Sequence, residues 1–240
     1  MLSDSPTDHP STCRFPERNR VPDFTTFSSL LRITRKYEIP AIRSQLLGVV
    51  RDAYPETFEG LGPSKPLGES VFSGTTPHPN EVLNLFVQQK LTSALPIAYY
   101  MAAQRGLNSL MDRRLPHNAT LSPEVLQSAI GGLMALREVE LNDTHRLIFG
   151  SGPCSSHLCP SRTPTDPASV KTYQMIFDHV VGSSRHGTKV LKVPEFCYTY
   201  EDGDITVVVD VCRICEERLK SGHAELRKRA WAMLSDAFEI

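Results

Sequence analysis

Four cysteines arranged as two close pairs are the residues whose chemistry the sequence suggests first. Cys154 and Cys159 bracket the loop CSSHLC, and Cys212 and Cys215 form the motif CRIC. Four thiolates from two such knuckles would satisfy tetrahedral zinc. The histidines available to replace one of the thiolates are His157 and His223. Spacing also permits a second interpretation, in which Cys212 and Cys215 are two core thiols on one buried face of a helix. The separation between the two cysteine pairs favours this interpretation, because it exceeds that of compact zinc fingers.

Two enzymatic alternatives use the same residues. Cys154 and His157 could be drawn as the nucleophile and base of a cysteine-dependent hydrolase, but their loop offers no group to orient the imidazole. The motif CRIC resembles the start of a zinc-dependent ubiquitin ligase domain, which requires eight interleaved ligands. The sequence has no GxSxG elbow, P-loop, GxGxxG or HExxH motif. We therefore expect no catalytic and no cofactor-binding residues.

Composition narrows the class of partner. The chain has 240 residues, 40% hydrophobic and 22% charged, with a formal net charge of −1. Such a charge supplies no long-range field toward nucleic acid or anionic lipid, and no apolar run reaches the ~18 residues that a membrane span needs. We expect a protein of the cytoplasm, the nucleus or both that binds neither nucleic acid nor membrane. Its cysteines should be thiols or metal ligands rather than disulfides.

Residues 27–47, FSSLLRITRKYEIPAIRSQLL, predict two short helices broken at Pro40. Proline disfavours helical backbone at the preceding residue and is tolerated in a first turn, so Pro40 can end one helix and open the next. The apolar stripe of the first helix consists of Phe27, Leu30, Leu31 and Tyr37, and that of the second of Ile42, Leu46, Val49, Val50 and Ala53. A tight helical hairpin or corner follows.

The rest of the chain predicts a mainly α-helical protein in three parts: a disordered arm (1–22), a helical region (23–149) and a cysteine-containing module (150–240). The helical region contains a proline-rich connection over 55–79, in which Val71 and Phe72 could dock locally. It also contains helices over 81–91, capped by Asn80, and over 95–106.

The clearest helix should run from Pro123 to about Leu141, with Ser122 as its cap. Its buried stripe is predicted as Leu126, Ile130, Leu133 and Leu136. The pair Gly131-Gly132 inside it suggests a close helix crossing. In the third part we predict helices over 170–181 and 224–238. Residues 205–211 have strand chemistry, which leaves a short extended pair or a helix start equally open.

Three phrases of the sequence resemble fungal, basidiomycete-type BTB/POZ domain-containing proteins. These are the hairpin phrase above, the region 79–141, and the tail VCRICEERLKSGHAELRKRAWAMLSDAFEI. The resemblance implies closing BTB helices, a post-BTB helical bundle and structural zinc held by the two cysteine pairs. Since only about 22 polar residues precede the first helix, the chain would lack most of the N-terminal BTB core.

The same resemblance implies a non-catalytic adaptor or scaffold. BTB proteins dimerise and recruit partners such as cullin ubiquitin ligases and transcriptional regulators. Homodimerisation and cullin binding depend on the missing core. The interaction residues implied on the hairpin are Leu30, Leu31, Tyr37, Ile42 and Leu46.

Overall fold

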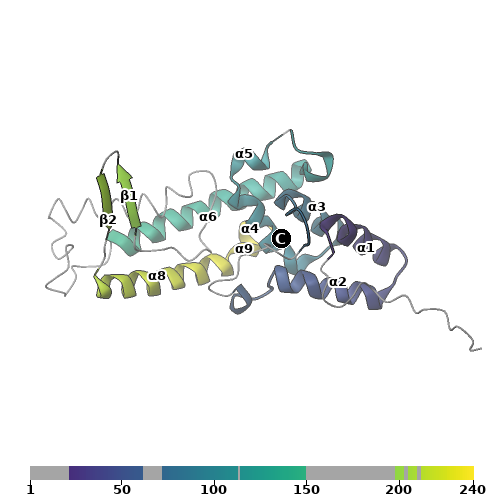
Figure 1. Cartoon of the computed structure of the whole chain (residues 1–240), viewed down its shortest axis with the longest axis horizontal. Coiled ribbons are helices and arrows are strands. Elements are labelled where there is room, and N and C mark those ends of the chain that lie inside the picture. The colour runs from purple at the N-terminus through teal and green to yellow at the C-terminus, as the bar shows by residue number, and fades with distance from the viewer. Residues whose placement is uncertain (1–21, 62–71, 113, 150–197, 203–204, 210–211) are drawn as a thin grey trace, which may run out of the picture.

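A computed structural model describes residues 22–61, 72–112, 114–149, 198–202, 205–209 and 212–240 of the chain (Figure 1). These residues are mainly α-helical, which confirms the predicted fold class. The α-helices are α1 (Phe24–Lys36), α2 (Pro40–Ala53), α3 (Pro79–Gln89), α4 (Leu95–Gln104), α5 (Leu107–Leu110), α6 (Pro123–Phe149), α8 (Arg213–Ala232) and α9 (Leu234–Ala237). Short 3-10 turns lie at η1 (Glu59–Leu61), η2 (Thr92–Ala94) and η3 (His117–Ala119).

The predicted hairpin at Pro40 is present. Asp23 caps α1 by accepting a hydrogen bond from the Thr26 amide at 2.9 Å, and Pro40 is the first residue of α2. Between the helices Glu38 has a φ of 50°. Tyr37, predicted on the buried stripe, is instead 63% exposed. It directly follows the last residue of α1 and lies about 120° around the helix from Leu31, so it points away from the core.

The caps of α3 and α4 were partly predicted. The glycine predicted after α4 is Gly106, whose φ of 79° ends the helix. The N-cap of α3, however, is His78 and not Asn80. The His78 side chain accepts from the Asn80 amide at 3.2 Å, and Glu81 accepts from the His78 amide at 3.3 Å, which completes a capping box. The side chain of Asn80 is fully buried.

Helices α6 and α8 run antiparallel and form an arm that extends away from the group α1 to α5 (Figure 1). Three contacts fix this direction, because partners later in α6 lie earlier in the C-terminal segment. Gly132 faces Phe238, Asp143 pairs with Arg229 at 2.9 Å, and Leu147 packs on Gly222. Both helices are longer than predicted: α6 continues to Phe149, and α8 begins at Arg213 rather than near residue 224.

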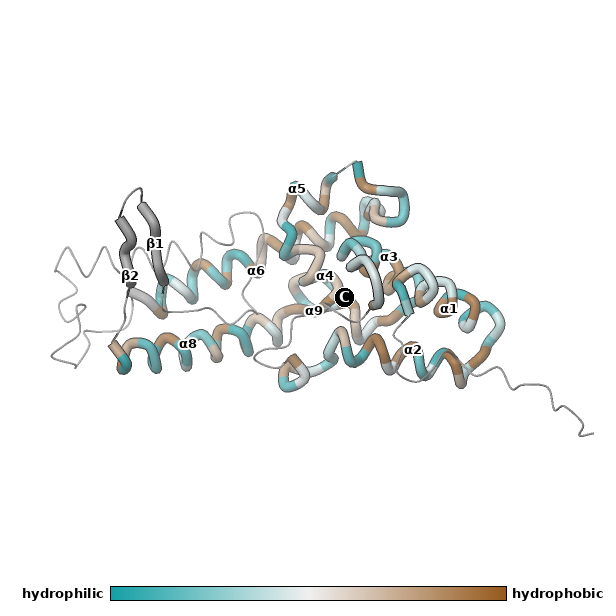
Figure 2. The backbone as a smooth tube through the Cα atoms, viewed as in Figure 1, coloured by the Kyte–Doolittle hydropathy of each residue, from teal (hydrophilic) through white to brown (hydrophobic). Residues whose placement is uncertain are grey.

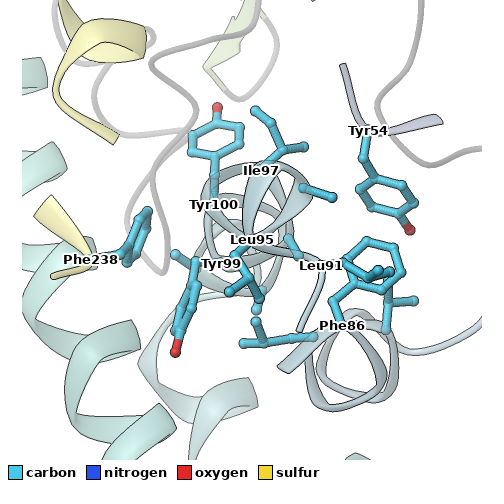
Figure 3. Packing of buried hydrophobic residues seen from close by; sticks show 14 of the residues in the cluster. Tyr54, Phe86, Leu91, Leu95, Ile97, Tyr99, Tyr100 and Phe238 are labelled. Carbon is cyan, nitrogen blue, oxygen red and sulfur yellow. The ribbon is translucent and has the colours of Figure 1, made fainter. Parts of the chain in front are cut away.

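One hydrophobic core joins the N-terminal and C-terminal helices. Tyr54 packs edge-on against Phe86 with ring centroids 4.8 Å apart, and Tyr99 stacks on Phe238 at 5.1 Å (Figure 3). The cluster extends from Phe27 in α1 to residues of α8 and α9. The C-terminal helices of the predicted cysteine-containing module therefore pack in the same core as the preceding helices. The cause is the apolar face of α8 and α9, made up of Leu226, Ala230, Leu234 and Phe238.

A β-hairpin follows α6 in the chain. Strand β2 (Ile205–Val209) lies where strand chemistry was recognised, and β1 (Tyr198–Asp202) pairs with it antiparallel, Tyr198 opposite Val209. The sequence therefore held an extended pair and not a helix start. In the proline-rich connection, Phe72 is buried. Its ring centroid lies 5.1 Å from that of Phe24 and 5.1 Å from that of Phe27. The predicted disordered arm, Val71 and the predicted helix over 170–181 lie outside the described residues.

The two adjacent glycines of α6 differ in their surroundings, and this predicts opposite effects of alanine. A Cβ on Gly132 would lie 2.0 Å from the Phe238 ring, whereas one on Gly131 would meet nothing within 4 Å. Gly132→Ala should lower the free energy of unfolding by about 1–3 kcal/mol through overpacking. Gly131→Ala should raise it by up to ~1 kcal/mol, because alanine is the better helix former. Urea denaturation of both variants tests this, and equal effects would contradict the crossing at Gly132.

Candidate functional site

The predicted zinc ligands fall partly inside the structure. Cys212 is the half-buried N-cap residue of α8, and Cys215, three residues later, is fully buried. Arg218 donates to the Cys215 sulfur at 3.9 Å. Cys154, Cys159 and His157 lie outside the described residues. Within the described residues no group of three or more His, Cys, Asp or Glu side chains could hold a metal, so Cys212 and Cys215 fit at most one half of a two-knuckle site.

The alternate ligand His223 does not fit that site. It lies eight residues after Cys215 on the continuous helix α8, which separates the two residues by about 12 Å along the axis. Ligands of one zinc ion are bound at ~2.0–2.3 Å from the metal, so their donor atoms lie within about 4 Å of one another. The suggestion that His223 replaces a thiolate is therefore wrong, and the reason is its position two turns along the helix.

We call the contact between α6 and α8 the seam, and His223 lies on α8 next to Gly222, on which Leu147 of α6 packs. The His223 side chain is buried, as are those of Glu140 and Thr144 on α6. Burial, with a smaller effect from Arg227, lowers the pKa of His223 to about 4. The imidazole is therefore neutral at pH 7 and acts as a packed core residue. At the edge of the seam, Arg229 Nη1 lies 2.9 Å from Asp143 Oδ2.

A serine and a histidine also approach each other at the start of α3. Ser109 Oγ lies 3.4 Å from Nε2 of His78, a pairing that could suggest a nucleophile and its base. The other ring nitrogen, Nδ1, accepts a hydrogen bond from the Asn80 amide. A neutral imidazole that accepts at Nδ1 carries its proton at Nε2, so His78 donates to Ser109 and cannot remove its proton. Burial lowers the pKa of His78, which favours this neutral form, and the pair serves as a helix cap.

The exposed side of α1 presents large apolar side chains to solvent. Ile33 is 45% exposed and Tyr37 is 63% exposed, and Leu30 is half-buried on the same side. At about 100° per residue, Leu30, Ile33 and Tyr37 fall within an arc of about 60° beside the core-facing Phe27 and Leu31, with Leu30 nearest to the core and Ile33 farthest from it. We call these three residues the α1 ridge. Figure 2 shows hydrophobic and hydrophilic residues interspersed along α1.

The five predicted interaction residues divide between core and surface. Leu31 and Leu46 are 0% and 1% exposed and pack in the core, so they are corrected to structural residues of the hairpin. Leu30 and Ile42 are half-buried against the core, and Tyr37 is exposed. Ile33 was missed. Its spacing of three from Leu30 and four from Tyr37 was the available signal, but the buried stripe of Phe27 and Leu31 dominates the pattern.

Comparisons with known proteins leave the family open. No protein-family model, no curated protein and no solved structure matches this chain significantly. Among the described residues, no helix has both the length and the apolar character to cross a bilayer. The geometry of the described side chains therefore carries the functional argument.

Proposed function

We propose that this chain is a non-catalytic protein-interaction module that binds a protein partner through the α1 ridge. The observation that carries the proposal is the exposure of Ile33 and Tyr37 on a helix whose adjoining face is held in the core by Phe27 and Leu31. Contiguous apolar side chains on a soluble surface mark interaction sites. Spacings of three and four residues are those by which a helix presents anchors to a groove or to another helix.

The fixed position of the ridge supports this role. Asp23 caps the start of α1, Phe24 and Phe27 pack on Phe72, and Arg35 on α1 donates to the Gln88 carbonyl oxygen of α3. A ridge held rigidly loses little conformational entropy on binding. The resemblance to fungal BTB/POZ proteins supports an adaptor or scaffold role for such a module, since it implies recruitment of other proteins.

Substitution of the ridge should abolish partner capture. In Ile33→Ser/Tyr37→Ser, quantitative affinity purification from the native cells should recover the specific partner at less than about a tenth of the wild-type amount, since hot-spot residues cost ≥ 2 kcal/mol when truncated. Both residues are exposed, so the melting temperature should change little.

Helix α5 offers a matched control for this experiment. Leu107 and Met111 are also four residues apart and are 44% and 54% exposed. The variant Leu107→Ser/Met111→Ser should retain the partner. Equal recovery with wild type, ridge variant and control variant would reject the α1 ridge as the binding surface.

We further propose, on the resemblance and the spacing of Cys212 and Cys215, that zinc pins the start of α8. When bound, the ion would act as a structural cross-link between the two cysteine pairs. Native mass spectrometry of chain purified without chelator should detect one zinc per chain. Cys212→Ser should lose the ion, whereas His223→Gln should keep it, because His223 is ~12 Å away along α8. A metal-free wild-type chain would contradict this proposal.

A further inference from the structure

The side of α1 next to the ridge is basic, and this charge bears on the chemistry of the partner. Arg32, Arg35 and Lys36 are exposed on α1, and exposed Lys90 lies just after α3. Arg32 donates to the side-chain oxygen of Gln88 at 3.3 Å, and Arg35 donates to the backbone oxygen of the same residue. These hydrogen bonds bring the cations of α1 to the end of α3, two residues before Lys90. We call the four residues the basic edge.

The charge of the basic edge is not neutralised within the described part of the chain. None of its four residues forms an ion pair with another described residue. Glu38 is the one acidic residue between Phe24 and Arg51. The chain as a whole carries a charge of −1, so this excess of positive charge is local to the surface around the α1 ridge.

The basic edge and the α1 ridge are continuous. The ammonium group of Lys36 lies 5.4 Å from the centroid of the Tyr37 ring, within the range of a cation–π contact. On a helix, Arg32 and Lys36 lie four residues apart along one line, and Ile33 and Tyr37 lie along the adjacent line. A ligand that covers the apolar line therefore meets the cationic line at its flank.

We infer that the segment which docks on α1 is an acidic amphipathic helix of a protein partner, an inference that rests on the proposed function of the same ridge. Its apolar residues, at spacings of three and four, would cover Ile33 and Tyr37. Its carboxylates, on the flank of that stripe, would pair with Arg32 and Lys36. Complementary charge of this kind steers association and fixes the register of two helices.

A polyanion without apolar groups fits this surface less well. A nucleic-acid backbone would satisfy the cations but leave Ile33 and Tyr37 in water. An anionic bilayer attracts a segment by about 1 kcal/mol for each basic residue near its surface. The chain as a whole carries a net charge of −1, so its acidic residues would offset this attraction. The juxtaposition of apolar and cationic lines is the complement of an acidic amphipathic helix.

A designed peptide tests the inference with the full chain. The probe is a fluorescent helical peptide of about 18 residues, or five turns, with leucines at alternating spacings of three and four and glutamates on one flank. Its binding is followed by fluorescence anisotropy at two salt concentrations. We expect saturable binding that weakens about tenfold from low to physiological salt, because exposed charges are screened. A peptide of the same composition in scrambled order should bind at least about tenfold more weakly.

Charge reversal identifies the surface. Lys36→Glu/Lys90→Glu and Arg32→Glu/Lys36→Glu should each weaken peptide binding about tenfold or more, since like charges then oppose the glutamates. Lys36→Glu/Lys90→Glu leaves Arg32 and Arg35 in place, so their hydrogen bonds to Gln88 are kept. Weaker peptide binding by this variant would therefore not be caused by loss of the contact between α1 and α3. The control Arg146→Glu/Lys228→Glu makes the same change in net charge with exposed residues of α6 and α8, and it should bind as wild type does.

Two results would overturn the inference. One is equal binding of the ordered and scrambled peptides. The other is tighter binding of single-stranded RNA or of phosphatidylserine vesicles than of the ordered peptide. The proposed function fails separately: if Ile33→Ser/Tyr37→Ser still loses its cellular partner while the acidic peptide does not bind, the ridge is a docking site for a helix of different charge.

Discussion

Phe238→Ala is expected to lower the free energy of unfolding by roughly 3–5 kcal/mol, the range for removing a buried aromatic ring from a core. Phe238 is fully buried, stacks on Tyr99 with an interplanar angle of 21°, and lies against Gly132 of α6. It thus joins α9 to α4 and α6, as Figure 3 shows for Tyr99 and Phe238. Losing a quarter or more of a typical domain's stability should be visible in urea denaturation and in thermal melting.

A neighbouring side chain supplies the control for Phe238. Ile240 lies two residues later and is 43% exposed, so Ile240→Ala should change the free energy of unfolding by no more than about 0.5 kcal/mol. A small effect of Phe238→Ala, similar to that of Ile240→Ala, would show that the C-terminal residues do not close the core.

The second large effect is a loss of stability in mild acid caused by His223. Burial lowers its pKa to about 4 in the folded chain from an ordinary value of 6.5. Because the unfolded chain binds the proton more tightly, stability is complete above about pH 6.5 and falls as the pH is lowered toward 4. The difference corresponds to roughly 3 kcal/mol at most. Denaturant unfolding measured at intervals between about pH 4 and pH 7.5 should reveal this slope.

Substitution of His223 separates this effect from general acid denaturation. His223→Gln should remove most of the slope between about pH 6.5 and pH 4, whatever its effect on stability at neutral pH. A smaller slope should remain, because burial also lowers the pKa of His78. The variant His117→Gln, at an exposed position in η3, should keep the wild-type slope. An unchanged slope in His223→Gln would contradict burial of a neutral imidazole between α6 and α8.

Local signals explain which features of the fold could be predicted. Pro40 and the sequence Ser122-Pro123-Glu124 determine helix starts through backbone chemistry that acts within one turn. In the structure, the Val125 amide donates to Ser122 Oγ at 3.4 Å. The apolar stripes of α2 and α6 were likewise read from their own spacing and face the core, and the stripe of α1 does so except at Tyr37.

The failures arise where packing overrides local sequence. The end of α6 was predicted near Leu141, but the helix continues to Phe149, and its polar side chains Glu140 and Thr144 are buried. The first turns of α8 are highly charged and gave no apolar stripe. The start of α8 is stabilised instead by salt bridges between residues four apart, Arg213 with Glu217 and Glu216 with Lys220.

The candidate site was recognised by segment but not by residue. The sequence directed attention to the hairpin, and Tyr37 and Leu30 do lie on its exposed side. It could not separate them from the buried Leu31 and Leu46. Which apolar line faces inward depends on α3 and Phe72, which are distant from α1 in the sequence. The same tertiary contacts leave Ile33 exposed.

Site-specific photocrosslinking from α1 tests most directly whether this chain is a protein-interaction module. A photoreactive amino acid is placed at Ile33 in one form of the protein and at Leu107 of α5 in another, and both are irradiated in the native cells. Our account predicts a discrete covalent adduct with a protein from position 33 and none of that mass from position 107. Identical adduct patterns from the two positions, or no adduct from position 33, would contradict it.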